Sequence, residues 1–291
     1  MNISKTLSNT MDNKQYKLMN KVPEITLLFW IIKILTTAMG EAASDYVSHG
    51  LLGSGGPPGP GGPEGPVGSP GPGLVGGSGL AMIIFCGLLV ISLILQFRAR
   101  RYVTWIYWLN TALISVVGTM VADGLHLDHV VSTTIFAIIL AAILIGWYMS
   151  EKTLSPHSIN TRRREAFYWA TVMATFALGT AVGDMTADAF GLGFLWSGIM
   201  FIGIIAIPAL AYKLFKANEI FTFWFAYIIT RPLGASFADW MTAPRDSLGW
   251  SQPVVVLTLV FAIIILVAYM GLTRMDVKKP TESCNDKIAN T

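Results

Sequence analysis

Eight apolar blocks follow one another along the chain, each of roughly 18–22 residues and long enough to cross a hydrocarbon core of about 30 Å. They lie at residues 24–46, 79–97, 102–124, 130–149, 165–189, 193–214, 219–241 and 253–273. Lipid offers backbone groups no hydrogen-bond partner, and the short alternating strands of a membrane barrel are absent from the sequence. The pattern therefore predicts an all-α, polytopic membrane protein with eight transmembrane helices.

Composition narrows the class of protein further. Hydrophobic residues make up 53% of the 291 residues and charged residues 13%, and the mean hydropathy is +0.58. Soluble domains carry about a quarter of charged residues. This composition excludes an ordinary soluble enzyme and a disordered tail.

Basic residues gather on one side of the predicted membrane. Of the 20 Lys and Arg, 17 lie in the polar tails at 1–21 and 275–291, at the end of the last apolar block, or in the connections after the second, fourth and sixth blocks. The connections on the other side hold only Arg245. Cytoplasmic loops carry an excess of Lys and Arg, so we expect both termini in the cytoplasm.

An internal repeat is the most informative feature of the chain. Four Trp residues, each preceded by Phe or Tyr, stand ten positions before a Gly and fifteen before an Asp. The Trp residues are Trp30, Trp108, Trp169 and Trp224, the glycines are Gly40, Gly118, Gly179 and Gly234, and the aspartates are Asp45, Asp123, Asp184 and Asp239. Each repeat covers two helices, which keeps all four in the same orientation. Such repeats are related by an axis along the membrane normal, so we expect four hairpins around that axis.

The repeats occupy residues 22–97, 98–149, 160–215 and 217–274. The first contains an insertion at 53–73 in which every third residue is Gly and the rest are rich in Pro. Two interpretations stay open. The insertion forms an extended extracytoplasmic loop, or it makes a contact with a collagen-like trimerising role.

A polar stripe marks one face of the first helix of each repeat. Positions seven, eleven and fifteen after the Trp share a face because they are four residues apart. The stripe includes the four aspartates and, deeper in the membrane, Thr37, Glu41, Ser115, Thr119, Thr180 and Arg231, while Asp188 continues it in the third repeat. Polar groups on an apolar helix avoid lipid. We therefore expect the first helices to converge on a central polar path, with the aspartates at its extracytoplasmic mouth.

Several of these residues allow two interpretations. The aspartates either anchor helix ends at the membrane surface or form a cation or proton site, which the carboxyl pairs Glu41/Asp45 and Asp184/Asp188 favour. Lys33 and Arg231 lie at mid-depth, where they form structural ion pairs with other helices or act as counter-charges to a bound cation. The repeated Trp residues are interface or packing residues or a cation–π filter. The repeated Gly residues permit close helix packing.

With these motifs, the sequence resembles the bacterial membrane proteins built from four tandem copies of a two-helix repeat of unknown function, each with a characteristic Trp. The resemblance covers residues 21–274, and the Gly/Pro insertion departs from it. It implies an eight-helix protein of the bacterial inner membrane and supplies no established substrate.

Two functions follow as hypotheses. The first is a transporter or exporter of a small cation, a proton or a divalent metal, with the ion as a partner besides the lipid bilayer. The second is a membrane scaffold or sensor in which the repeated motif serves packing. Motifs for a zinc protease, a serine hydrolase or nucleotide binding are absent from the sequence. We expect no enzymatic activity, no cofactor and no nucleic-acid partner.

Overall fold

The computed structural model describes residues 20–51, 77–125, 127–242 and 247–277. The N-terminal tail up to residue 19, the insertion at 53–73 and the C-terminal tail from residue 278 lie outside the described residues. Within the described residues the secondary structure is helical, as the apolar blocks predict. The long helices are α2 (Leu27–Asp45), α3 (Gly77–Arg98), α4 (Thr104–Gly124), α5 (His129–Glu151), α6 (Arg162–Asp184), α7 (Gly193–Phe215), α8 (Glu219–Thr242) and α9 (Gln252–Thr273).

The helix ends follow from local hydrogen bonding. The Thr26 hydroxyl accepts from the Phe29 N–H to cap α2, and the Thr161 hydroxyl caps α6 in the same way at Arg164. Such side chains satisfy donors that a helix start leaves unpaired. The predicted eight-helix fold is thereby confirmed. The details that the sequence did not predict include a short 3-10 helix, η2 (Pro156–Ser158), and two π-helical turns, η1 (Tyr46–Leu51) and η3 (Met185–Ala189), which directly follow α2 and α6.

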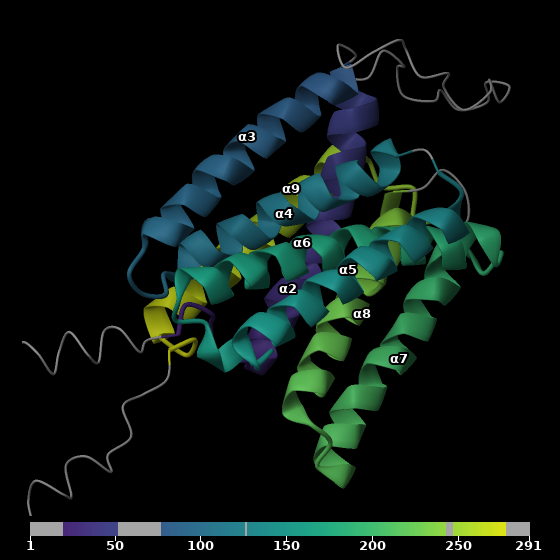
Figure 1. Ribbon diagram of the computed structural model, residues 1–291. Coiled ribbons are helices and arrows are strands. Elements are labelled where there is room, and N and C mark those ends of the chain that lie inside the picture. Colours follow the sequence, from purple (N-terminus) through teal and green to yellow (C-terminus); the bar gives the residue numbers. More distant parts are fainter. Residues whose placement is uncertain (1–19, 52–76, 126, 243–246, 278–291) are drawn as a thin grey trace, which may run out of the picture.

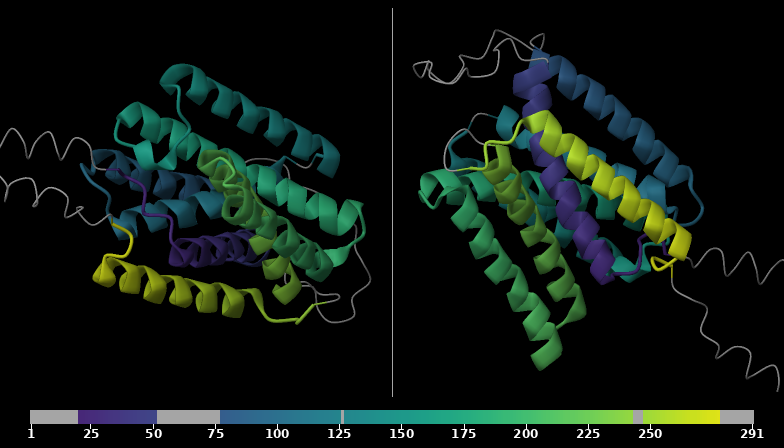
Figure 2. Two further views of the ribbon diagram at one scale, coloured as in Figure 1. Left: turned by 90° about the horizontal axis from the view of Figure 1, so that it is seen from below. Right: turned by 180° about the vertical axis from the view of Figure 1, so that it is seen from behind.

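The helices form two layers. The first helices of the repeats, α2, α4, α6 and α8, pack in that order into a closed ring. Each outer helix packs chiefly on the inner helix of the next repeat: α3 on α4, α5 on α6, and α7 on α8 (Figure 1). The last outer helix, α9, returns to α2 and closes the cycle (Figure 2). The expected hairpins are therefore interlocked, because the outer helix of each repeat packs on the inner helix of the next repeat rather than on that of its own.

Burial separates the layers. In the most apolar stretch of α2, α4 and α6, 67–72% of the residues are buried, against 22% in α3, α5, α7 and α9. Seven of the described helices are long and apolar enough to cross a membrane. The remaining one, α8, has the length but carries Arg231 near its middle, which lowers its hydropathy. The Arg231 side chain is fully buried inside the ring that α8 helps to form, so its charge does not meet lipid.

Glycine sets the spacing of the inner ring. Each repeated Gly lies against the residue seven positions after the Trp of the next repeat, so small residues face larger ones around the cycle. The four contacts are Gly40 with Ser115, Gly118 with Phe176, Gly179 with Arg231, and Gly234 with Thr37. A Cβ on any of these glycines would lie within 2.7 Å of its neighbour. Close approach of the helices therefore requires Gly at these positions.

We predict that Gly40→Ala destabilises the ring. Its Cβ would fall 1.7 Å from the Ser115 hydroxyl oxygen and 2.9 Å from the Ser115 carbonyl carbon, so the backbones must separate. The free energy of unfolding should fall by about 1–3 kcal/mol, the usual effect of overpacking. Thermal unfolding of the purified protein in detergent, followed by circular dichroism, measures the change.

The matched control is Gly87→Ala on the outer helix α3, where an added Cβ meets no atom within 4 Å. That variant should keep or slightly raise the melting temperature, because Ala favours helix over Gly by about 1 kcal/mol. Adding Ser115→Gly to Gly40→Ala should restore part of the loss. Equal effects at Gly40 and Gly87 would contradict the packing role.

Candidate functional site: a charged core inside the helix ring

A buried guanidinium joins all four inner helices. Arg231 of α8 is fully buried, and its Nη1 donates to the Thr37 carbonyl of α2 at 2.9 Å. Its Nη2 donates to the Glu41 carboxylate of α2, to the Thr119 hydroxyl of α4, and to the Thr180 hydroxyl of α6 at 2.7 Å. An Arg at this depth is stable only when paired. Glu41 supplies the charge and the three helices supply acceptors for Nη1 and Nη2, while Nε has no hydrogen-bond partner among the described residues.

An acidic cluster lies on one side of Arg231. Carboxylate oxygens of Glu41, Asp45 and Asp123 lie within 4.8 Å of one another. Glu41 is buried, Asp45 is half-buried and Asp123 is exposed, so the three carboxylates lead from the surface into the ring. Oxygen ligands of this kind suit hard cations such as Mg²⁺, Mn²⁺ and Ca²⁺.

The other repeated aspartates belong to the same electrostatic group. Asp184 and Asp239 each interact through charge with Glu41 and Asp45, and Asp123 interacts with Asp184. Together the four repeats thus place their aspartates at one end of the ring. Carboxylates gathered in this way repel one another unless protons or cations neutralise some of them.

The π-helical turns occur where the acidic pairs are. Asp45 is the last residue of α2 and η1 follows it; Asp184 is the last residue of α6, and η3 contains Asp188. Asp188 is exposed and acts on Asp184 through charge. The second and fourth repeats, whose inner helices are α4 and α8, have no such turn in the described residues. Single π turns often occur at functional sites.

Aromatic rings close the opposite end of the ring. The aromatic residue before each Trp contacts the Trp of the next repeat, at centroid distances of 5.4–6.0 Å. These pairs are Phe29–Trp108, Tyr107–Trp169, Tyr168–Trp224 and Phe223–Trp30. The hydroxyls of Tyr107 and Tyr168 lie 2.6 Å apart across the interior. In this structure the repeated Trp residues pack inside the protein, with Trp30 half-buried and the others buried.

Lys33 lies in the buried interior without a carboxylate partner. Its side chain is 1% exposed, and its ammonium nitrogen is 3.7 Å from the centroid of Phe176 and 4.3 Å from that of Tyr227. Among the described residues, no hydrogen bond reaches the Lys33 nitrogen. A cation over ring faces gains some electrostatic stabilisation, far less than an ion pair at this depth provides. Of the two expected ion pairs, the structure therefore forms that of Arg231 and not that of Lys33.

The remaining stripe residues are fully buried. Thr37 donates to the Ile34 and Thr230 carbonyls, Thr119 and Thr180 contact Arg231, and Ser115 lies against Gly40. None of the four hydroxyl side chains reaches solvent. The acidic end of the predicted polar path therefore leads to an interior that is closed in this structure.

The sequence patterns did not identify the two aromatic residues that contact Lys33, Phe176 and Tyr227. Phe176 occupies position seven of the third repeat, where the other repeats carry Thr, Ser or Arg. Tyr227 lies three residues after Trp224, the same position that Lys33 holds after Trp30, and this position is not part of the Trp–Gly–Asp motif. The sequence signal that could have identified Phe176 is its place in the polar stripe, because an aromatic ring at a position that is otherwise polar indicates a special contact with a neighbouring helix.

The chain matches the family model described as Repeat of Unknown Function (DUF347) four times, at residues 28–102, 106–153, 167–218 and 222–276. Each match begins near the start of an inner helix and ends after the following outer helix. Neither a curated protein nor a solved structure matches the chain. The family matches cover most of the sequence, and the chain belongs to this four-repeat family, as its resemblance implied.

We predict that breaking the Arg231–Glu41 pair destabilises the protein strongly. Glu41→Gln or Arg231→Gln leaves one buried charge without its partner, which costs about 3–5 kcal/mol of unfolding free energy. The double variant should lose less than the sum of the two, because it removes both charges. Denaturant unfolding of the four proteins in micelles provides the double-mutant cycle.

Arg163→Gln is the control for this cycle. The Arg163 side chain is 68% exposed and lies 3.8 Å from the Glu151 carboxylate, and exposed pairs contribute about 0–1 kcal/mol. Its unfolding free energy should stay close to wild type. Additive losses in the Glu41/Arg231 cycle would show that the two side chains do not act as a pair.

Proposed function

We propose that this member of the four-repeat family moves a small cation, a proton or a divalent metal ion, through its inner helix ring. The observation that carries the proposal is the convergence of Glu41, Asp45 and Asp123 to within 4.8 Å. Two inner helices contribute these ligands, so an ion bound there would bridge neighbouring repeats. The chemistry is binding and release at carboxylates and involves no bond-breaking reaction.

The balance of charge supports this proposal. Six carboxylates, those of Glu41, Asp188 and the four repeated aspartates, lie at one end of the ring. Among the described residues of the inner helices, the buried basic ones are Arg231 and Lys33. Carboxylates in excess of nearby cations bind protons or metal ions in order to remain close together. Arg231 and Lys33 then act as counter-charges that prevent a cation from passing freely.

The distribution of basic residues supports one orientation of the protein in the membrane. The connections α3–α4, α5–α6 and α7–α8 are basic, and they lie at the end opposite the acidic cluster. With the basic end in the cytoplasm, the cluster faces the extracytoplasmic side. We place the protein in the bacterial inner membrane as a multi-pass protein. The aromatic contacts would then close the cytoplasmic end, while the buried side chains around Arg231 close the path from the extracytoplasmic side in this structure.

A scaffold or sensor is the alternative function. The observation that favours it is the cyclic Gly contact, because the Trp–Gly–Asp motif contributes directly to helix packing. Packing alone does not require six carboxylates at one end of the ring. A scaffold would therefore tolerate neutral amides at these positions.

We predict that Asp45→Asn and Asp184→Asn abolish ion flux while the folded protein still accumulates. Each change removes a charge that an ion would neutralise, and it keeps the shape of the side chain. Proteoliposomes loaded with a Mn²⁺-sensitive or a pH-sensitive dye measure the flux. Flux of the transported ion should fall to the level of empty liposomes.

Asp128→Asn is the matched control, since Asp128 lies in the connection between α4 and α5, outside the cluster. Its carboxylate accepts from the Val130 N–H to cap α5, a role that Asn also fulfils. This variant should transport normally. If wild-type protein moved neither ion, or if the aspartate variants transported normally, the scaffold function would be favoured.

We further predict that Lys33→Met raises stability and lowers transport. Met fills a similar volume between Phe176 and Tyr227 and removes a buried cation that lacks a carboxylate partner. Replacing buried charge by well-packed apolar groups stabilises some proteins by about 1–4 kcal/mol. A higher melting temperature together with reduced flux would identify Lys33 as a functional charge. Lower stability with unchanged flux would contradict that role.

A further inference from the structure

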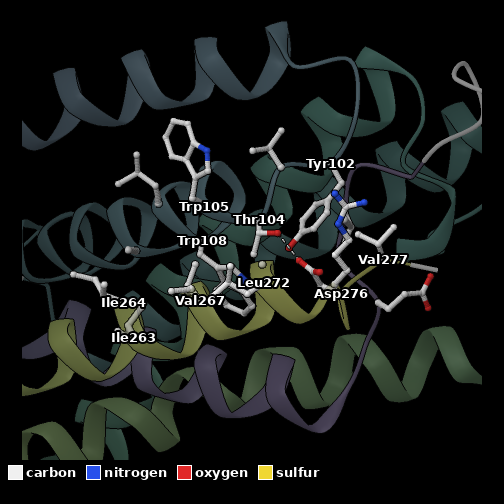
Figure 3. A pocket seen from close by; sticks show the side chains of 18 of the residues that line it. Tyr102, Thr104, Trp105, Trp108, Ile263, Ile264, Val267, Leu272, Asp276 and Val277 are labelled. Atoms are coloured by element: carbon white, nitrogen blue, oxygen red, sulfur yellow. Dashed lines mark hydrogen bonds between the residues drawn. The ribbon is translucent and has the colours of Figure 1, made fainter. Parts of the chain in front are cut away.

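A groove of about 1240 Å³ lies on the outer face of the protein, away from the acidic cluster. Typical small-molecule pockets measure about 300–1,000 Å³, so this groove suits a larger ligand. Side chains of α4 and α9 line most of it, among them Trp105, Leu109, Ile263, Ile264 and Val267. Figure 3 shows the apolar residues of α9 along the groove and Tyr102, Thr104 and Asp276 gathered at one end.

The groove is exposed where a membrane protein meets acyl chains. Trp105 is 56% exposed and Ile264 is 59% exposed, and both belong to helices long and apolar enough to span the membrane. Apolar side chains in these positions face hydrocarbon. An extended apolar ligand can therefore enter the groove sideways from the bilayer.

The polar end of the groove, where Tyr102, Thr104 and Asp276 gather, holds a buried carboxylate. Asp276 is 3% exposed, and the Thr104 hydroxyl donates to its Oδ2 at 2.5 Å. The other oxygen, Oδ1, has no hydrogen-bond partner in the described part of the chain. Burial and the charge of Asp276 raise the pKa of the neighbouring Tyr102 hydroxyl, which therefore stays neutral. The Tyr102 hydroxyl beside it is a neutral donor, and no ion pair among the described residues neutralises the Asp276 charge, so this carboxylate can accept a cationic donor.

Two arginines line the same end. Arg101 precedes α4 and Arg274 follows α9, and both are exposed side chains of the groove lining. Neither forms an ion pair within the described ranges. Guanidinium groups bind phosphate with paired hydrogen bonds. The polar end thus offers two cations for a phosphate and two carboxylates, those of Asp276 and its neighbour Glu24, of which Asp276 is the buried one, for an ammonium group.

We propose that the groove binds one phospholipid with a primary ammonium headgroup, of the phosphatidylethanolamine class. Its acyl chains lie along α9, its phosphate contacts Arg101 and Arg274, and its ammonium donates to Asp276. A choline headgroup has no N–H to donate, and a glycerol headgroup leaves the Asp276 charge without a cation. The lipid would fill the space beside α9, the helix that closes the cycle of repeats. This site does not depend on the proposed ion transport.

Native mass spectrometry tests the site directly. The purified full chain is equilibrated in micelles with equal amounts of phosphatidylethanolamine, phosphatidylcholine and phosphatidylglycerol, and the lipids retained after release are identified. Wild type should retain one phosphatidylethanolamine about tenfold over either competitor, the effect of one hydrogen bond to a charged group. Equal retention of the three lipids, or preference for another headgroup, would overturn the proposal.

Paired variants separate the contacts. Arg101→Gln with Arg274→Gln should abolish retention, whereas Arg98→Gln with Arg100→Gln removes the same charge from residues that do not line the groove and should leave retention unchanged. Asp276→Asn should cancel the preference for ethanolamine over choline, since its amide still accepts from Thr104. An unchanged preference in Asp276→Asn, or equal loss in both arginine pairs, would refute the assignment.

A steric variant covers the case in which Asp276→Asn fails to fold. Ala268→Trp on α9 places a large ring in the groove and should displace lipids of every headgroup. Leu257→Trp on the same helix is the control, because Leu257 is 68% exposed and does not line the groove. Retention by Ala268→Trp equal to that of the control would place the lipid elsewhere and overturn the proposal.

Discussion

Buried polar groups in a membrane must find their partners inside the protein, and this constraint ties Arg231 to the other helices of the inner ring. Its guanidinium receives acceptors from the other three inner helices and its charge is balanced by Glu41. No single helix could satisfy it, because its partners come from three different repeats. The inner ring is therefore the smallest unit in which this residue is stable.

The cyclic packing likewise makes each repeat depend on its neighbour. Each outer helix covers the inner helix of the following repeat, and each repeated Gly leaves room for a residue of that repeat to pack against it. A repeat taken alone has an uncovered inner helix and an unused glycine. Four repeats complete the cycle because α9 reaches α2, so the number of repeats and the closed ring depend on each other.

The two ends of the ring differ in chemistry, so the ring is polar along its axis. Aromatic contacts close one end, and carboxylates from all four repeats gather at the other. Lys33 and Arg231 lie inside, away from lipid. The two buried positive charges thus lie deeper in the ring than the carboxylates, the order that the proposed cation transport would use to restrict passage.

The sequence by itself determined the eight helices, the four repeats and the face of each inner helix that carries polar residues. Hydropathy and the Trp–Gly–Asp spacing are local properties, so they are readable along the chain. Only the tertiary structure decided which polar groups meet. It paired Arg231 with Glu41 across 190 positions and left Lys33 over the rings of Phe176 and Tyr227. Spacing places a side chain on a face of its own helix, whereas its partner depends on how the neighbouring helices cross, and that crossing was set by glycine contacts between repeats.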